Sequence, residues 1–306
     1  MEKIGVVILN YMTWVETNNC INSILEDKIP GNVQIYVVDN ASPNRDEIEI
    51  EQFGNQIHFI ENECNLGYAA GNNVGITQAL KDGCDYILIS NNDILFEKGC
   101  IGGMVQYLTD NPEYGIVAPC VLDCKRELQR CHFKKKVTYA DIWKTQTLAR
   151  YICRTGVEQV YGKEEFYLHG QDLFAASGCC FMMSSKCARM VTPLDENTFL
   201  YEEENILGIR MEHHGIKTRY LPECRVIHNH DQTTRLVKPF ALTCWACSEI
   251  YYLSKYLLVP RRYLLVLYWY RVCIFLIHGL KDREYRKHWK EFKRKTDSYL
   301  QRKYGE

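Results

Sequence analysis

The first hundred residues alternate between short apolar runs and longer segments with helical spacing. The strand-like runs span residues 4–9, 33–38, 58–60 and 86–90, and the helical segments span residues 14–26 and 68–81. Parallel strands need long crossover connections, which are usually helices, so this alternation predicts an α/β fold with a doubly wound, mostly parallel sheet. The 306 residues suffice for one large α/β domain with an appendage, or for two domains.

Asparagine or aspartate follows each of these four predicted strands. The residues are Asn10 (with Tyr11) after the first strand, Asp39 and Asn40 after the second, Asn62 and Asn65 after the third, and Asn91, Asn92 and Asp93 after the fourth. Any one of them alone could be a turn residue or a helix cap, which is the commoner use. Doubly wound sheets bind ligands at the carboxyl ends of their strands, so the four together predict a ligand-binding edge.

No glycine-rich phosphate loop follows the first strand. The sequence contains neither the G-x-G-x-x-G fingerprint nor the G-x-x-x-x-G-K-[ST] loop. A diphosphate can instead be held through a divalent cation on an acidic loop. Residues 91–93 suit that use, because one carboxylate would bind the metal and the amides would bind sugar hydroxyls.

Two later segments are suited to the same edge. Residues 174–183, FAASGCCFMM, contain the small pair Ser177 and Gly178, which indicates a close approach of the backbone to a ligand or another strand. Residues 199–205, FLYEEEN, place three glutamates at the start of a predicted helix that ends at Gly215. Glutamates there favour the helix dipole, but a desolvated carboxylate beside other acids can also act as a general base.

Histidines follow the last predicted strands, which span residues 218–221 and 225–227. His228 and His230 are either structural or, in a carboxylate-rich protein, metal ligands, and both interpretations are open. Residues 123–170 have little periodicity and are predicted to be a variable insertion.

The chain contains fifteen cysteines scattered through apolar segments, and we expect no secretory signal, because a strand-like run begins within four residues of Met1. The cysteines are therefore expected to be small core residues in a reducing cytoplasm. Cys120, Cys124, Cys131 and His132 have a loosely zinc-like pattern, although their spacing fits no compact zinc module well.

The C-terminal part combines apolar and basic segments. Residues 263–277 form an apolar run of fifteen residues interrupted by Arg271, short of the roughly 20 needed to span a bilayer. Residues 281–303 hold ten Lys and Arg against four Asp and Glu, in a chain of net charge −1. Such a tail either lies on a membrane surface or packs on the main domain as a buried helix, and it lacks any nucleic-acid-binding module.

Taken together, these stretches resemble a known family. VVILNY, VVDNAS, ENECNLGYAAGNNVGI, YILISNNDILF, ASGCCFMM, FLYEEEN and RYLPECRVIHNH occur in this order from about residue 4 to residue 231. The set is similar to the family 2 glycosyltransferases with the GT-A fold, especially the rhamnosyltransferase-like branch. The resemblance implies a GT-A domain over residues 1–236, with a Rossmann-like nucleotide-binding half and an acceptor half, and a helical segment over residues 237–306.

The resemblance also implies a site for a nucleotide-sugar donor. Asp39 would read the base, with Asn10 and Tyr11 near the same nucleoside. The further candidate donor-binding positions are Asn65, Gly67, Asn72, Asn91, Asn92, Ser177 and Gly178.

A metal site and a catalytic base are implied as well. Asp93 matches the metal-binding acid of the D-x-D element, whose first acid is Asn91 here, and would bind Mg²⁺ or Mn²⁺. His228 matches a position that can complete the site, with His230 as the alternative. Glu203 and Glu204 match a Glu-Asp pair whose second member is the catalytic base, so Glu204 is the expected base, with Glu203 and Glu202 as rivals.

The implied activity is an inverting, metal-dependent transfer of a sugar from a UDP- or dTDP-linked donor. The acceptor would be a hydroxyl of a glycan or lipid-linked oligosaccharide in surface polysaccharide synthesis. We expect a cytoplasmic protein, at the inner face of the membrane if residues 249–306 contact lipid, with no nucleic-acid partner. The alternatives are a non-catalytic sugar-nucleotide or glycan binder on the same fold and a nucleotidyltransferase. The second would need a basic residue in a glycine-rich loop after the first strand, and VVILNYMTW has none.

Overall fold

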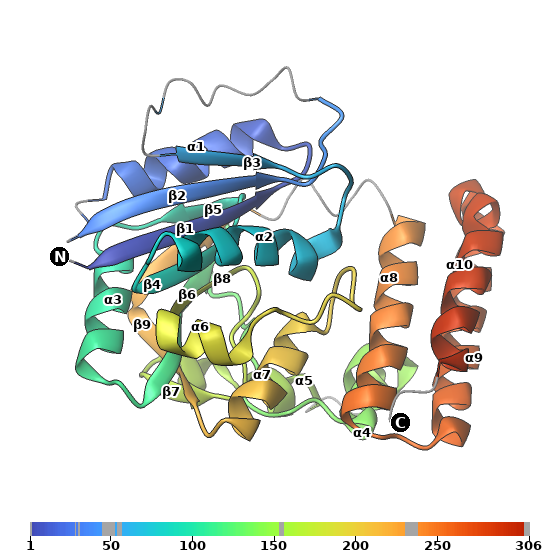
Figure 1. Cartoon of the computed structure of the whole chain (residues 1–306). Coiled ribbons are helices and arrows are strands. Elements are labelled where there is room, and N and C mark those ends of the chain that lie inside the picture. The colour runs from blue at the N-terminus through green and yellow to red at the C-terminus, as the bar shows by residue number, and fades with distance from the viewer. Residues whose placement is uncertain are drawn as a thin grey trace.

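The protein is described by a computed structural model in which residues 2–27, 29, 31–44, 53, 57–152, 156–229 and 238–302 are placed (Figure 1). The strands are β1 Lys3–Asn10, β2 Asn32–Asp39, β3 Ile57–Glu61, β4 Tyr86–Asn91, β5 Ile94–Phe96, β6 Tyr114–Leu122, β7 Gln171–Leu173, β8 Cys180–Ser184 and β9 Lys217–His228. The α-helices are α1 Trp14–Leu25, α2 Gly67–Lys81, α3 Cys100–Asp110, α4 Tyr139–Gln146, α5 Gly156–Tyr161, α6 Ser185–Val191, α7 Glu203–His213, α8 Lys238–Tyr251, α9 Arg261–Lys281 and α10 Arg283–Gln301. Short helical turns are η3 Leu148–Tyr151, η4 Glu164–Tyr167 and the π-helical η5 Tyr252–Tyr256.

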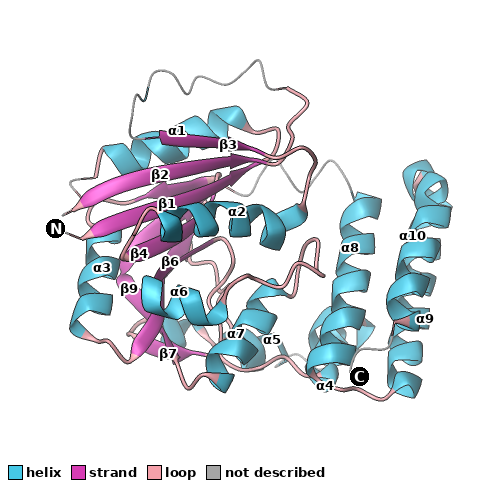
Figure 2. Ribbon diagram, viewed as in Figure 1, coloured by secondary structure: helices cyan, strands magenta, loops and turns pink. Residues whose placement is uncertain are grey.

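The strands form one mixed sheet in the order β3-β2-β1-β4-β8-β6-β9-β5, with β7 also paired to β9 (Figure 2). The first four strands are parallel, as are β6 and β9. β8 runs antiparallel between β4 and β6, and β5 and β7 run antiparallel to β9. The predicted α/β fold with a largely parallel, doubly wound sheet is thus confirmed, and each antiparallel pairing in it involves β8 or β9, from the second half of the chain.

Two apolar layers cover the sheet, one on each face. Buried side chains of α1 and α3 pack on one face, and those of α2, α6 and α7 pack on the other. The close fit of α2 depends on its small residues: a Cβ at Gly75 would lie 2.4 Å from Val7 Cγ1 of β1. The small-residue face of this segment therefore lets the helix backbone approach the strands, and it brings the start of α2 to the strand-end edge.

Two predicted strands are one strand in the structure. Residues 218–221 and 225–227 both belong to β9, and the register with β6 shifts between Pro119 and Cys120. The residues of β9 between Leu221 and Arg225 have no partner in β6, and the strand continues through them as a bulge without a turn. The segment 123–170, predicted to be irregular, contains α4, α5, η3 and η4, and α4 begins with a capping box between Thr138 and Asp141.

The C-terminal helices pack against the sheet-bearing part through a shared apolar cluster. Ile206 and Ile209 of α7 lie in one cluster with Tyr252 of η5 and Leu264 and Leu267 of α9. The apolar run expected to be too short for a bilayer lies within the 21-residue α9, which by length and composition alone could cross a membrane. Part of α9 is buried in the protein, however, so this test does not distinguish a span from a core helix.

Candidate active site

The carboxyl ends of the first four strands meet in one hydrogen-bonded network. Asn10 pairs with Asp39 in the sheet register, and its Nδ2 donates to Asp39 Oδ1 at 3.0 Å. Ser42 closes the group by donating its backbone N–H to Asp39 Oδ2 at 3.0 Å. Asp39 is buried, so its orientation is fixed before any ligand arrives. Tyr11, next to Asn10, is exposed at the same edge.

The polar residues at the turn between β4 and β5 contact two different loops, the β1–α1 loop and the loop before β8. Asn92 Nδ2 lies 3.1 Å from Asn10 Oδ1, 2.6 Å from Thr13 Oγ1 and 2.9 Å from Thr17 Oγ1. We expected this amide to bind sugar hydroxyls, but in the structure its hydrogen bonds go to Thr13 and Thr17 and stabilise the β1–α1 loop. The backbone N–H of Asn91 donates to Cys179 O at 2.8 Å, which ties the same turn to the loop before β8.

Asp93 lies against His228, the last residue of β9. Asp93 Oδ1 and His228 Nε2 are 3.3 Å apart, and both side chains are buried. Gln129 Oε1 lies 3.3 Å from the other ring nitrogen, His228 Nδ1. The two residues meet because β5 pairs antiparallel with β9, which sets Ile94 opposite His228.

Asp93 and His228 fit a divalent cation as two ligands. A carboxylate oxygen and an imidazole nitrogen lie 3.3 Å apart, and both belong to the ligand types that divalent metal ions use in proteins. Within the described ranges, no group of three or more His, Cys, Asp or Glu side chains is placed to hold a metal ion. A cation bound here would therefore need further oxygens from a ligand or water. His230, the alternative ligand, lies outside the described residues.

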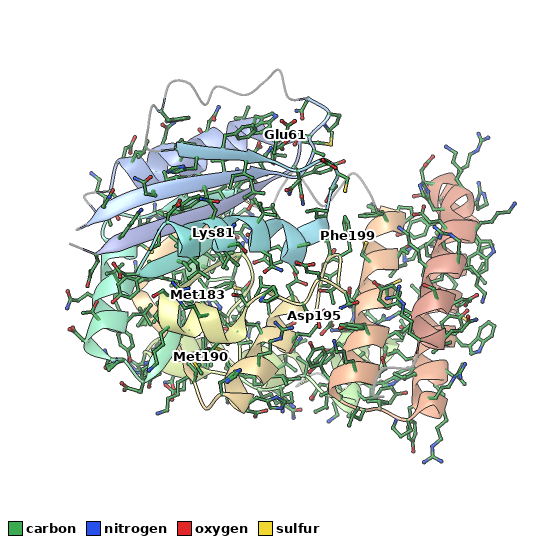
Figure 3. All side chains as sticks on the ribbon, in the orientation of Figure 1. Glu61, Lys81, Met183, Met190, Asp195 and Phe199 are labelled. Carbon is green, nitrogen blue, oxygen red and sulfur yellow. The ribbon has the colours of Figure 1, made fainter. Side chains whose placement is uncertain are left out.

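The loop before α2 is shaped by its own asparagines. Asn65 Oδ1 accepts from the Gly67 N–H at 3.0 Å and from Asn40 Nδ2 at 3.2 Å. The Tyr68 N–H donates to Phe199 O at 2.8 Å. Phe199 belongs to the loop before α7, and in space it lies between the start of α2 and α8, where its ring contacts Phe240 (Figure 3). Asn72 is buried one turn into α2, where its Oδ1 has no hydrogen-bond partner.

The backbone at Gly178 lies close to a carboxylate of α7. Its N–H donates to Glu204 Oε1 at 3.1 Å, and its carbonyl accepts from Tyr68 Oη at 2.5 Å. A Cβ there would lie 3.0 Å from Tyr68 Oη and 3.1 Å from Glu204 Oε1. The close approach predicted from the Ser177–Gly178 pair is thus present, and it positions Glu204.

The three glutamates differ in their surroundings. Glu202 is buried, its Oε2 accepts from Asn205 Nδ2 at 3.0 Å, and burial together with the charges of Glu249 and Glu204 raises its pKa to about 8. Burial and the Glu204 charge raise the pKa of Glu203 well above the usual range, and its Oε2 has no hydrogen-bond partner. Burial also raises the pKa of Glu204, while backbone N–H groups of Glu204 and Gly178 oppose that rise.

His132 is fixed on both sides of its ring. Its Nδ1 accepts from the Ser177 N–H at 3.0 Å, so Nε2 carries the proton and donates to Pro119 O at 2.8 Å. Burial lowers its pKa to about 4, which keeps the ring neutral. The zinc-like pattern of Cys120, Cys124, Cys131 and His132 is therefore not a metal site, because both nitrogens of the histidine are used in the protein.

Sequence reasoning missed three residues that position this edge. Tyr68 holds Gly178, Gln129 contacts His228, and His132 fixes Ser177. Tyr68 stood in the quoted NLGYAAGNN stretch, but its partner is 110 residues away. Gln129 and His132 lie in the segment that gave no periodic signal. A separate groove of about 750 Å³ between β3 and α2 is lined by residues such as Phe59 and Val74 and by none of these acids.

Fold and site together define an α/β protein whose strand ends form a polar edge, faced by a helix start that carries carboxylates. The sequence profile described as Glycosyl transferase family 2 matches residues 5–189, which is more than half of the chain. The protein belongs to glycosyltransferase family 2.

Similar proteins agree with this family and with the GT-A fold. The low-salt glycan biosynthesis hexosyltransferase Agl10 of Haloferax volcanii is 26% identical over 238 residues, which are 76% of this chain and 70% of that protein. The crystal structure of S. aureus TarS 1-349 aligns with a TM-score of 0.52 at 12% identity, over 81% of this chain and 65% of that crystallised chain. GalNAc-T7, crystallised with UDP, GalNAc and Mn²⁺, gives a TM-score of 0.61 at 12% identity, over 82% of this chain and 48% of its own. At such identity these two structures show the fold, and the predicted GT-A fold is confirmed.

Proposed function

We propose that the protein transfers a hexosyl group from a UDP- or dTDP-linked donor to a hydroxyl of a glycan or lipid-linked oligosaccharide, with inversion at the anomeric carbon. The proposal rests on one observation: an unbroken series of contacts links the strand ends from Asp39 to Glu204. Asp39 contacts Asn10, Asn10 contacts Asn92, Asn91 contacts Cys179 through the backbone, and the neighbouring Gly178 contacts Glu204. Groups suited to a nucleoside, a diphosphate and an acceptor hydroxyl thus follow one another along the strand ends.

The donor would lie across the first four strand ends. Asp39 would accept hydrogen bonds from the base, with Tyr11 beside the nucleoside. The pre-set Asn10–Asp39–Ser42 network supports this role, because a carboxylate already fixed by its neighbours loses little freedom on binding.

The diphosphate would lie beside Asp93 and His228, which would hold Mg²⁺ or Mn²⁺. When bound, such a cation neutralises the charge that develops on the departing diphosphate. The Mn²⁺ in the crystal of GalNAc-T7 belongs to that protein, and it supports the proposal only through the shared fold.

The catalytic base in this proposal is Glu204. It would take the proton of the acceptor hydroxyl, whose oxygen then forms a bond to the anomeric carbon from the face opposite the breaking bond to the diphosphate. A raised pKa makes a carboxylate a stronger base, and the bond from the Gly178 N–H fixes its orientation. Glu203 is the rival, since its Oε2 is also buried; Glu202 is bound to Asn205 and is less suited.

Replacement of the base tests the proposal. We expect Glu204→Gln to fold and to bind donor normally but to lose transfer by about 100-fold or more, because an amide cannot accept the proton. Transfer is measured as release of nucleoside diphosphate from a panel of UDP-, dTDP- and GDP-linked sugars, and folding by thermal unfolding. Glu212→Gln, on the exposed part of α7, is the matched control.

Full activity of Glu204→Gln together with loss in Glu203→Gln would move the role to Glu203. A wild-type protein that binds a donor but neither transfers nor hydrolyses it would contradict the proposal and favour the non-catalytic binder.

We further propose that the protein works at the inner face of a membrane, held there by α9 and α10. A row of exposed apolar side chains recurs every three or four residues along α9: Tyr263, Val266, Trp269, Cys273, Leu276, Ile277 and Leu280. A row of exposed basic side chains runs along α10: Arg283, Arg286, Lys287, Lys290 and Arg294. The two rows belong to packed helices, since Lys293 Nζ lies 5.9 Å from the centroid of the Trp269 ring.

An apolar row beside a basic row matches an anionic lipid surface. The apolar side chains would enter the boundary of the acyl region, and the cations would remain among the headgroups. Such a placement would bring the transferase to a lipid-linked acceptor of the kind used in surface polysaccharide synthesis. The free thiols of the described cysteines suit a reducing compartment.

A further inference from the structure

Tyr201 holds an unusual conformation directly before the proposed base. Tyr201 and Glu202 both have left-handed backbones, with φ of 74° and 68°, and α7 begins at the next residue, Glu203. Two successive side-chain-bearing residues rarely adopt this conformation, and such backbones persist where the surrounding structure imposes them, often at functional sites. The turn leaves the Tyr201 side chain 38% exposed beside the carboxylates.

The ring of Tyr201 lies against Trp245 of α8. Their ring centroids are 6.4 Å apart at an interplanar angle of 50°, and Trp245 is itself half-buried. The two rings come from segments 44 residues apart, so the C-terminal helices contribute directly to the surroundings of the α7 start. We call Tyr201 and Trp245 the aromatic platform.

A buried ion pair, Arg271–Glu249, packs against the Trp245 ring of the platform. The Arg271 guanidinium carbon lies 4.6 Å from the centroid of the Trp245 ring, and Arg271 is only 3% exposed. Arg271 Nε donates to Glu249 Oε2 at 2.8 Å, and Arg271 Nη1 donates to Gln146 O of α4 at 3.2 Å. Arg271 is thus fixed by α8 and α4, and it packs on the Trp245 ring, which limits the freedom that this ring could lose on binding a ligand.

The platform and the carboxylates offer complementary surfaces to one class of ligand. A pyranose ring carries C–H groups on its faces and hydroxyls on its edge. The Tyr201 ring is apolar and stays neutral, because burial and the nearby Cys244, Glu203 and Glu204 raise its pKa. The C–H faces of the pyranose would therefore lie on the rings while its hydroxyls reach the carboxylates.

We propose that Tyr201 and Trp245 bind the pyranose ring of the acceptor by stacking and direct one of its hydroxyls toward Glu204. This assignment rests on the proposed function and deepens it, because it names the two residues that bind the acceptor sugar. Tyr201 and Trp245 are therefore specificity-determining residues of the acceptor side and take no part in donor binding.

Kinetics with soluble acceptors test the assignment on the full chain. The probes are methyl glycopyranosides of the common hexoses, with nucleoside diphosphate release as the readout. We expect Tyr201→Ala and Trp245→Ala each to raise the acceptor KM about tenfold, the upper end of what one aromatic contact contributes. Donor hydrolysis without acceptor should stay within about twofold of wild type, and Tyr201→Phe should keep the wild-type KM because the ring is retained.

The matched control is Tyr151→Ala, which removes an exposed aromatic side chain from η3. An unchanged acceptor KM in Tyr201→Ala would overturn the assignment. So would a Tyr201→Phe variant as impaired as Tyr201→Ala, because the hydroxyl and not the ring would then matter. Trp245 packs on a buried arginine, so the half-exposed Tyr201 keeps the test valid if Trp245→Ala fails to fold.

Binding of the same glycosides, followed by saturation-transfer NMR in the presence of UDP, separates this proposal from the proposed function. Saturation of the pyranose C–H signals in wild type and its loss in Tyr201→Ala would support the platform even if no transfer were detected. Equal saturation in both proteins, or none in wild type, would overturn the platform while leaving donor hydrolysis as the readout of the proposed function.

Discussion

At the scale of single residues, the most informative feature is a run of three glutamates with three different environments. Glu202 turns inward toward Asn205 and the Arg271–Glu249 pair, Glu203 is half-buried with its Oε2 atom enclosed, and Glu204 meets the Gly178 N–H. Burial of several carboxyl groups close together is costly when they are charged, so their pKa values rise. A chemically uniform sequence run thus becomes a set of distinct acids.

The raised pKa of Glu202 predicts a pH-dependent stability. Its carboxyl has a pKa of about 8 when folded and an ordinary 4.5 when unfolded, so the folded state holds the extra proton between these values. Stability is therefore fully present below pH 4.5 and is lost as the pH rises toward 8, by about 1.4 kcal/mol per pH unit for one proton. We expect Glu202→Gln to reduce this slope, measured by urea unfolding at pH 5, 6.5 and 8. Glu196→Gln is the control, and equal slopes in wild type and Glu202→Gln would contradict the prediction.

Asp93 yields a second prediction at this scale. We expect Asp93→Ala to weaken Mn²⁺-dependent donor binding by about tenfold or more, because it removes the carboxylate that would bind the cation. Calorimetry with UDP and Mn²⁺, repeated in EDTA, measures the effect. Asp110→Ala, at the end of α3, is the control. Affinities that are equal in both proteins and indifferent to EDTA would remove Asp93 from the metal site.

At the scale of elements, the start of α7 is held by helices that follow it in the chain. Ser248 Oγ of α8 donates to Leu200 O at 2.7 Å, and Tyr251 Oη donates to Asp195 Oδ2 at 2.7 Å. Figure 3 shows Asp195 and Phe199 facing α8. The loop that presents the glutamates is therefore pinned to α8 on one side, and through Phe199 O to α2 on the other.

The buried pair Arg271–Glu249 should be an important element-level contact. Removal of one partner leaves a buried charge unpaired, so we expect Arg271→Met to cost about 3–5 kcal/mol of unfolding free energy. The double variant Arg271→Met/Glu249→Leu should recover a large part of the loss, because no lone charge remains. Urea unfolding measures both, with Lys287→Met as the control for an exposed pair. If Arg271→Met lost no more unfolding free energy than Lys287→Met, the pair would be well hydrated in solution.

At the scale of the whole molecule, the C-terminal helices combine an inner and an outer surface. Their inner side shares the apolar cluster with α7, so deleting them would expose that core as well as remove the outer surface. The outer side carries the apolar row of α9 and the basic row of α10. Point substitutions on the outer side therefore test membrane contact more cleanly than truncation.

Vesicle flotation measures that contact. We expect the wild-type protein to float with phosphatidylglycerol-containing vesicles and less with pure phosphatidylcholine, and salt to weaken the binding. The triple variant Val266→Ser/Leu276→Ser/Leu280→Ser should lose flotation by about tenfold or more, from the buried apolar area that it removes. The control is Leu148→Ser/Ile152→Ser, at exposed apolar positions outside α9. If the triple variant floats as well as wild type, or if wild type is a dimer and the triple variant a monomer, the apolar row packs against another protein copy and not against lipid.

Sequence patterns determined the first half of the fold, because they act over short distances. Apolar runs of strand length, helical spacing and polar strand ends are set by neighbouring residues, so β1 to β4, α1 and α2 and the polar edge at their strand ends followed from them. The same patterns could not show that β8 inserts antiparallel between β4 and β6, because strand partners distant in sequence are chosen by packing.

The residue types at the edge, and the family that they resemble, can be read from the amino-acid order alone. The task of each residue depends on the folded chain, which turns Asn92 inward to Thr13 and Thr17, sets His228 beside Asp93, and places Gly178 against Glu204. The folded chain also brings Trp245 to Tyr201. The physical reason is that an asparagine, histidine or glutamate has several uses of similar energy, and burial and hydrogen-bond partners supplied by distant segments select one.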